Sequence, residues 1–158
     1  VLAPSAGIDE SNAASHYILL PSEPEKINRD WRNILLHHYN LSNLGLILTD
    51  SRSMPLRRGV VGVGLACAGF YPLRDYRGQL DLFGRPMKIS QTNIVDSLAA
   101  AAVYVMGECA EQTPAVIIRG VKDLHFTNND CSSELWLDPG EDIYEPLYHN
   151  FLPGGGRK

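Results

Sequence analysis

The sequence predicts an α+β chain in which helices pack on a mixed sheet. Two nearly unbroken apolar runs, residues 44–48 and 60–69, have the length and composition of buried strands. Two longer segments, residues 22–38 and 93–106, repeat apolar side chains at the spacing of an amphipathic helix. Strands and helices therefore follow one another along a single chain.

The composition narrows the class of protein. A chain of 158 residues suffices for one domain with a sizeable core, so we expect a domain over residues 1–152 and a flexible tail over 153–158. Hydrophobic residues are 44%, charged residues 20% and the net charge is -4, which argues against a general nucleic-acid or anionic-membrane surface. We see no membrane-spanning run and no secretory signal. Cys67, Cys109 and Cys131 form no CxxC pair, which favours reduced thiols in a cytoplasm.

The first elements are a loop and a short strand. Residues 4–12 are mostly small and polar, which predicts a loop. Its Asp9 and Asn12 either point oxygens at one ligand or bond their own backbone in a turn. Residues 16–20 are the strand candidate.

A helix follows this strand. Ser22 with Glu25 forms a capping box, and Pro24 suits the first turn. The predicted core face carries apolar side chains, among which Trp31 is the largest; it consists of Ile27, Trp31, Ile34, Leu35 and His38. His37 and His38 are adjacent, so they point to different sides of the helix and are not a metal pair.

Polar residues follow the strand over residues 44–48. Thr49, Asp50 and Ser51 come directly after it, and Arg57 and Arg58 lie in the next turn. Carboxylate and hydroxyl oxygens suit a hard cation, and guanidinium groups suit phosphoryl oxygens. The alternative interpretation is a strand end, a polar turn and two solvated arginines.

The glycine-rich strand over residues 60–69 does not match a dinucleotide-binding motif, and its glycines indicate that another backbone comes close. The charged loops at 75–78 and 81–85 either hold a ligand or are salt-bridged surface.

The second half of the chain adds one helix and short strands. Asn93 caps a helix that Gly107 ends, with four alanines at 99–102 that permit close packing. Its expected inward residues are Ile94, Leu98, Ala102 and Val105. The remaining expectations are strands at 87–91 and 115–118, a covering loop at 128–142 and a short amphipathic end at 144–151.

Three carboxylates lie at the edges of these elements. Asp9, Asp50 and Glu108 have no His or Cys close to them in sequence, and such oxygen-only sets select Mg or Mn. With glycine-rich loops and arginines, the implied substrate is a nucleoside triphosphate.

The motifs together resemble a known family. They read AGIDESN at 6–12, TDS at 49–51, PLR at 55–57, DYRG at 75–78, DLFGR at 81–85 and MGE at 106–108. This set resembles the gamma-glutamyl ligases that finish the deazaflavin coenzyme F-420. The resemblance covers residues 6–120 and implies an α+β gamma-glutamyl ligase-like fold built as an intertwined homodimer. It further implies GTP or ATP, two divalent ions, a potassium ion and an acyl phosphate that the amine of L-glutamate attacks.

The resemblance also implies roles for single residues. Asp9 and Asp50 would be ligands of one ion, and Ser51 and Glu108 ligands of the second. The expected nucleotide contacts are Asn12 and four residues of the segment 104–111, namely Tyr104, Met106, Gly107 and Glu111. Arg57 and Arg77 would balance the charge of phosphate or substrate carboxylates.

Two departures from the family pattern matter, and the first concerns the acceptor. The deazaflavin enzymes carry a Phe-Gly-Arg-Pro-Trp run where this chain reads RSMPL at 52–56. That run, with PSA at 4–6 and EQTP at 111–114, is more like a branch proposed for folate metabolism. The chain also begins at Val1, close to the first motif, so we expect the trailing part of a longer protein.

Three functions follow from these observations. The first is glutamate ligation to a folate carboxylate, and the second is the same ligation on the deazaflavin precursor. The third is a non-catalytic remnant that binds a nucleotide, a metal or a partner.

Overall fold

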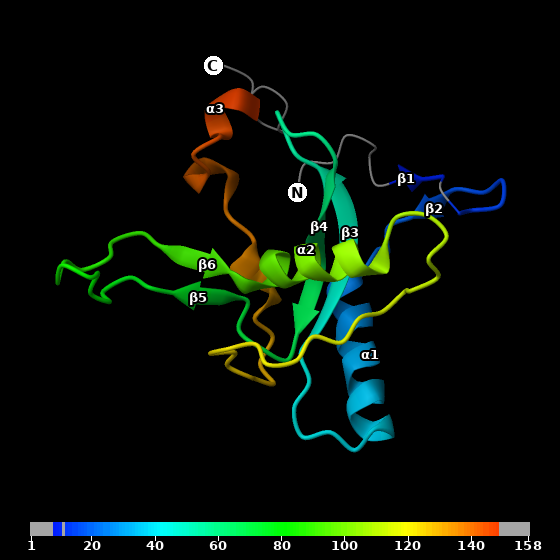
Figure 1. Cartoon of the computed structure of the whole chain (residues 1–158), viewed down its shortest axis with the longest axis horizontal. Helices are drawn as coiled ribbons and strands as arrows, with labels where there is room; N and C mark the ends of the chain where they lie inside the picture. The colour runs from blue at the N-terminus through cyan, green and yellow to red at the C-terminus, as the bar shows by residue number, and fades with distance from the viewer. Residues whose placement is uncertain (1–7, 11, 149–158) are drawn as a thin grey trace.

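The computed structural model describes residues 8–10 and 12–148, and it shows an α+β chain built from small antiparallel sheets (Figure 1). The paired strands are β1 (Ile8–Asp9) with β2 (Ile18–Leu19), β3 (Leu46–Ser53) with β4 (Val60–Ala68), and β5 (Leu73–Asp75) with β6 (Gln91–Asn93). The helices are α1 (Pro24–His38), α2 (Ile94–Met106) and α3 (Glu145–Tyr148), with short 3-10 turns at Ser132–Leu135 and Pro139–Glu141. The β3–β4 hairpin lies at the centre, and the other two hairpins project to opposite sides (Figure 1).

The predicted mixed sheet is wrong. Within residues 8–10 and 12–148, the strands form three separate two-stranded sheets, and all pairs are antiparallel. Within each pair the two strands are consecutive along the chain, as an antiparallel hairpin allows.

Helix α2 packs closely on the β3–β4 hairpin because β4 is rich in glycine. A Cβ at Gly62 would lie 2.4 Å from the carbonyl oxygen of Ala99, and one at Gly64 would lie 2.2 Å from Cγ1 of Val95. Val95 and Ala99 are fully buried in this contact. The expectation that glycines and alanines permit a close approach is therefore confirmed.

The boundaries of α2 agree with the sequence, but its buried face differs. The side chain of Asn93 accepts a hydrogen bond from the Asp96 backbone, and Gly107 ends the helix at φ +80°. Val105, expected inward, is exposed. Gly62 and Gly64 of β4 contact the face of the helix that carries Val95 and Ala99, so these two residues are the buried ones.

Helix α1 is rotated relative to its predicted orientation. Trp31, expected in the core, is 58% exposed, whereas Asn28 and Arg32 are the buried residues of the helix. Asn28 Nδ2 donates to the carbonyl oxygen of Leu46 at 3.0 Å, and Arg32 Nε donates to that of Leu44 at 2.7 Å. These bonds to the chain entering β3 hold the polar side of α1 inward.

The predicted capping box of α1 is also wrong. The residue before the helix is Glu23, which makes no capping side-chain bond, and Pro24 is the first helical residue. Because proline is preorganised for the first helical position, the residue that precedes it becomes the cap.

Three other segments differ from their predicted structure. Residues 8 and 9, expected in a loop, pair with β2; residues 1–7 and 11 lie outside the described part. The strand expected at 87–91 begins only at Gln91, where pairing with β5 holds it. The run 115–118 finds no partner strand in the described chain.

The C-terminal part agrees with the prediction in outline. The loop at 128–142 contains two 3-10 turns, and its Cys131 is buried near the end of β4. Helix α3 forms within the expected amphipathic end, whereas residues 149–158, including the predicted tail, lie outside the described part.

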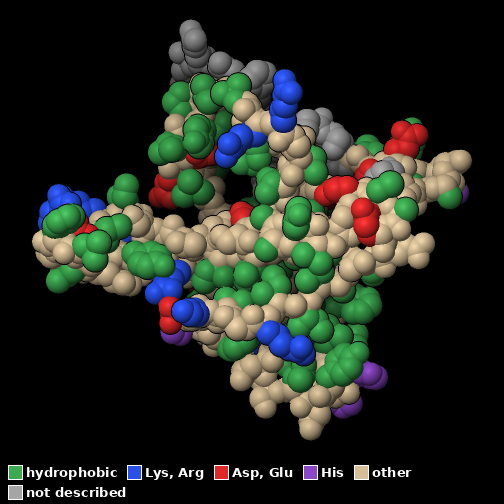
Figure 2. Space-filling view, viewed as in Figure 1, with side chains coloured by type: hydrophobic (Ala, Val, Ile, Leu, Met, Phe, Trp, Pro, Cys, Tyr) green, Lys and Arg blue, Asp and Glu red, His purple; other side chains and the backbone are tan. Residues whose placement is uncertain are grey.

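The surface of the described chain carries many large hydrophobic side chains. Leu19 is 68% exposed, Trp31 58% and Phe83 83%. Hydrophobic side chains gather over the projecting β5–β6 hairpin and over α1 (Figure 2). In the described part of the chain, no helix is long and apolar enough to cross a membrane.

Candidate functional site

Two of the predicted metal ligands meet at the end of α2. Ser51 Oγ donates to Oε2 of Glu108 at 3.0 Å. Ser51 lies opposite Gly62, whose position contacts α2, so its side chain is on the α2 face of the hairpin. Glu108 comes just after α2 ends, which brings residues 57 positions apart into contact.

The predicted nucleotide contacts also converge there. Asn12 Nδ2 donates to the carbonyl oxygen of Cys109 at 3.0 Å, which joins the first motif to the segment after α2. Glu111 Oε2 accepts from the Cys109 backbone at 2.8 Å. Gly107 suits this turn because its φ of +80° favours glycine, and the Glu111 side chain lies where a Cβ would be, with Cδ 2.3 Å from that position. Tyr104 is exposed on the last turn of α2, next to this turn.

Asp50 lies on the opposite face of β3 from Ser51. The strand continues to Ser53, so Asp50 is inside it and not after its end as predicted. One carboxylate oxygen of Asp50 accepts from the Ser51 backbone at 2.8 Å, and the other pairs with Arg52 Nη2 at 3.1 Å. Both oxygens are therefore held, which orients the carboxylate.

Arg52 is a residue that sequence reasoning missed. Its side chain is 8% exposed, and its Nε is a buried atom without a hydrogen-bond partner in the described chain. Residues two apart on a strand share a face. The spacing of Asp50 and Arg52 therefore contains the signal, once the strand is extended past residue 48.

The two predicted catalytic arginines lie away from this contact. Arg57 is exposed in the β3–β4 turn, and its side chain makes no ion pair with a described residue. Arg77 pairs with Asp75 at 2.5 Å at the start of the β5–β6 loop. That hairpin adjoins the first residue of α2, whereas Glu108 follows the last, and a helix of 13 residues is about 20 Å long.

The charged loops are salt-bridged, which is one of their two predicted alternatives. The hydrogen bonds from Arg77 hold the pKa of Asp75 below its usual value, and backbone and side-chain bonds from Arg85 do the same for Asp81. Both carboxylates therefore stay ionised at neutral pH.

The described residues contain no group of three or more His, Cys, Asp or Glu side chains placed to hold a metal. Asp9 is exposed in β1, which pairs with β2 on the side of the molecule where the turn after α2 also lies (Figure 1). Among the described residues, Ser51 contacts Glu108, and Asn12 contacts the turn after α2. The roles of all these residues toward ions and nucleotide stay predictions.

Comparison with known proteins supplies relatives that share most of this chain. "Coenzyme F420:L-glutamate ligase" of Methanopyrus kandleri is 43% identical over 143 residues, which are 89% of this chain and 56% of the relative. The proteins of the same description from Methanocaldococcus jannaschii and Methanococcus maripaludis are 38% identical over 144 residues and 36% identical over 140 residues. Each of these matches covers 89% of this chain and 55% of the relative.

The chain thus spans about half the length of the curated relatives it matches. The sequence pattern of one family, described as F420-0:Gamma-glutamyl ligase, matches residues 1–120. That match covers most of the chain and includes every residue of the candidate site. The chain belongs to the F420-0:Gamma-glutamyl ligase family.

Proposed function

We propose that this chain is part of a gamma-glutamyl ligase that adds L-glutamate to the precursor of the deazaflavin coenzyme F-420. The observation that carries the proposal is the contact of Ser51 with Glu108, two motif residues that are distant in sequence. The names of the relatives support the deazaflavin acceptor over the folate acceptor, which the sequence ranked first.

The chemistry explains why such an enzyme needs a phosphate donor. A free carboxylate resists attack because of its negative charge, and oxide is a poor leaving group. Transfer of a phosphoryl group from GTP or ATP makes an acyl phosphate, and the free amine of glutamate displaces the phosphate. Positively charged groups balance the charge that accumulates during this transfer.

The residues at the candidate site fit a hard divalent ion by their chemistry. Ser51 and Glu108 offer a hydroxyl and a carboxylate, the oxygen ligands that Mg and Mn prefer. Asp50 is oriented by Arg52, and with Asp9 it would hold a second ion. Such ions would balance the charge of the triphosphate, while Asn12 and the turn at 107–111 would contact the nucleotide.

The apolar surface supports a homodimer as the working form. Large hydrophobic side chains such as Trp31, Ile34 and Phe83 are more than half exposed, and a stable interface buries about 800 Å² on each partner. A two-stranded hairpin is only marginally stable alone in water, yet both outer hairpins project from the chain.

The test is ligation by the protein encoded in the full natural reading frame. The assay contains the deazaflavin precursor or tetrahydrofolate monoglutamate, L-glutamate, Mn or Mg, and GTP or ATP, with products read by mass spectrometry. We expect glutamate on the deazaflavin precursor, loss of that product in Glu108→Gln, and no loss in the exposed control Glu141→Gln.

Two results would contradict the proposal. Glutamate added to folate but not to the deazaflavin precursor would restore the folate interpretation. A folded protein that binds nucleotide and metal but ligates neither acceptor would favour the binding remnant.

A further inference from the structure

Arg32 of α1 is a buried cation without a carboxylate partner. The residue is 8% exposed. Its Nε donates to the Leu44 carbonyl oxygen at 2.7 Å and its Nη2 to Asn128 Oδ1 at 3.0 Å, and both acceptors are neutral. Among the described residues it has no ion-pair partner, and its Nη1 donates to no acceptor. A buried charge is costly unless an opposite charge accompanies it. An anion bound beside this guanidinium would therefore stabilise it.

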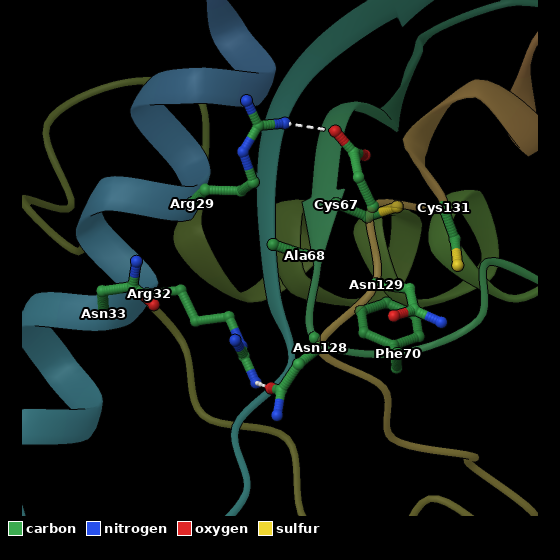
Figure 3. A pocket seen from close by; sticks show the side chains of 11 residues that line it. Arg29, Arg32, Asn33, Cys67, Ala68, Phe70, Asn128, Asn129 and Cys131 are labelled. Carbon is green, nitrogen blue, oxygen red and sulfur yellow. Dashed lines mark hydrogen bonds and ion pairs between the residues drawn. The ribbon is translucent and has the colours of Figure 1, made fainter.

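A cavity of about 190 Å³ lies beside this guanidinium, between α1, the end of β4 and residues 128–131 (Figure 3). Its rim carries amide groups that can donate hydrogen bonds. Asn128 uses its oxygen on Arg32, which leaves its Nδ2 hydrogens available. The side chains of Asn33 and Asn129 line the same cavity and make no hydrogen bond with a described residue.

The Arg32 side chain fits at this place because residue 69 is a glycine. A Cβ at Gly69 would lie 2.2 Å from Arg32 Nε and 2.2 Å from the Leu44 carbonyl oxygen. Gly69 also has φ +93°, a conformation that favours glycine. Only glycine at this position therefore lets the guanidinium reach the carbonyl and face the cavity.

One carboxylate lines the cavity, and it is already neutralised. Asp130 accepts from Arg29 Nη1 at 2.6 Å and from Ser132 Oγ at 2.5 Å, and the bonds from Ser132 lower its pKa. Figure 3 shows the Arg29 pair at the edge of the cavity, away from the guanidinium of Arg32. Two arginines and one aspartate give the cavity lining a net positive charge. Glu25 and Glu134 do not line the cavity, but they are close enough to raise the pKa of the neighbouring Cys67.

We infer that this cavity is a second binding site, which takes one small oxyanion, a carboxylate or a phosphate group, on Arg32 and the surrounding amides. Its planar guanidinium and amide donors match the geometry of such groups. The site is distinct from the Ser51–Glu108 contact. Six strand positions separate Gly62, opposite Ser51, from Ala68 at the cavity, which is about 20 Å along β4. It does not rest on the proposed ligase activity.

The test is a titration of the whole chain with inorganic phosphate, and separately with L-glutamate, at constant ionic strength. Calorimetry gives the affinity, and the NMR signal of the Arg32 Nε–H locates the anion. We expect millimolar or tighter binding of at least one of the two and competition between them if both bind. Phosphate without glutamate would identify a phosphate site, and the reverse a carboxylate site.

Variants separate this site from general attraction to positive charge. Arg32→Met should weaken binding by about tenfold or more, and the exposed control Arg119→Met should leave it unchanged. If Arg32→Met does not fold, Asn129→Asp serves instead, because it adds a negative charge at the rim without touching the bonds of Arg32. Binding that is absent in the unaltered chain, or equal in Arg32→Met or Asn129→Asp, would overturn the inference.

Discussion

Gly107 shows how a single residue shapes the candidate site. It ends α2 in a left-handed conformation and leaves room for the Glu111 side chain, which in turn bonds the Cys109 backbone. The same turn carries Glu108, so the position of this predicted ligand depends on a residue without a side chain.

The contribution of that turn can be measured by two matched substitutions. Gly107→Ala should lower the free energy of unfolding by more than Gly120→Ala, which changes a glycine of similar φ, +75°, with nothing within 4 Å of its Cβ. The positive φ alone costs an alanine about 1–3 kcal/mol in each variant. Urea denaturation measures both, and equal losses would show that the contact with Glu111 contributes nothing.

Cys67 is the residue with the clearest expected dependence on pH. Burial, with smaller effects of Cys131 and nearby carboxylates, raises the pKa of its thiol from 9.0 to about 11. At pH 8 only about 0.1% of it is thiolate, the form that reacts with alkylating reagents. Alkylation of Cys67, followed by mass spectrometry, should rise about tenfold per pH unit up to pH 10.

Linkage gives the corresponding effect on stability. The folded-state pKa of Cys67 is raised, so the favourable contribution is fully present below pH 9 and is lost as the pH rises toward about 11. The variant Cys109→Ser, which removes an exposed thiol, should leave the profile of Cys67 unchanged. A plateau in the alkylation rate near pH 9 would contradict the raised pKa.

At the scale of elements, the packing of α2 on β4 depends on missing side chains. Gly62 and Gly64 bring the helix close enough for Val95 and Ala99 to be fully buried. The helix is capped by Asn93 at one end and ended by Gly107 at the other. The helix therefore holds the Glu108 turn at a definite place along the hairpin.

A double-mutant cycle tests this contact. Gly64→Ala should destabilise the chain by about 1–3 kcal/mol, because the new Cβ would overlap Val95 Cγ1. Val95→Ala leaves a cavity and also destabilises. Combined, the two changes should cost less than the sum of the single effects, as measured by chemical denaturation. Strict additivity would mean that the helix moves away and does not press on Val95.

At the scale of the whole molecule, the exposed stripe of α1 is the surface that most needs a partner. Trp31 and Ile34 are more than half exposed and lie one turn apart on the helix. Asn28 and Arg32 on a neighbouring face of α1 bond carbonyl groups near β3, so the helix cannot rotate to bury the stripe without breaking these bonds.

Sedimentation equilibrium at micromolar concentration should therefore find a dimer, twice 17.5 kDa. Trp31→Glu should raise the dissociation constant of the dimer by about tenfold or more, since buried aromatic residues often dominate interfaces. Asn33→Glu places the same charge on an exposed residue of α1 that lies roughly 160° around the helix from Trp31 and 100° from Ile34, and it should have little effect. A stable monomer of the unaltered chain would contradict the dimer.

Short-range chemistry in the sequence determined both ends of α2 and the close-packing glycines of β4. Asn93 and Gly107 could be assigned from neighbouring residues, because caps depend on bonds within one turn. The glycines of β4 indicated a close approach, which the structure confirms with α2. The motifs identified the family, which the comparison shows.

Only the tertiary structure decided how these pieces face one another. Periodicity reveals that α1 has an apolar stripe, but it cannot say whether this chain or another surface covers Trp31. Bonds from Asn28 and Arg32 to carbonyl groups near β3 connect residues 12 or more positions apart, and no local pattern encodes them. The contact of Ser51 with Glu108 likewise depends on the packing of α2 against the hairpin, because alternation along β3 gives the face of a side chain but not what lies across from it.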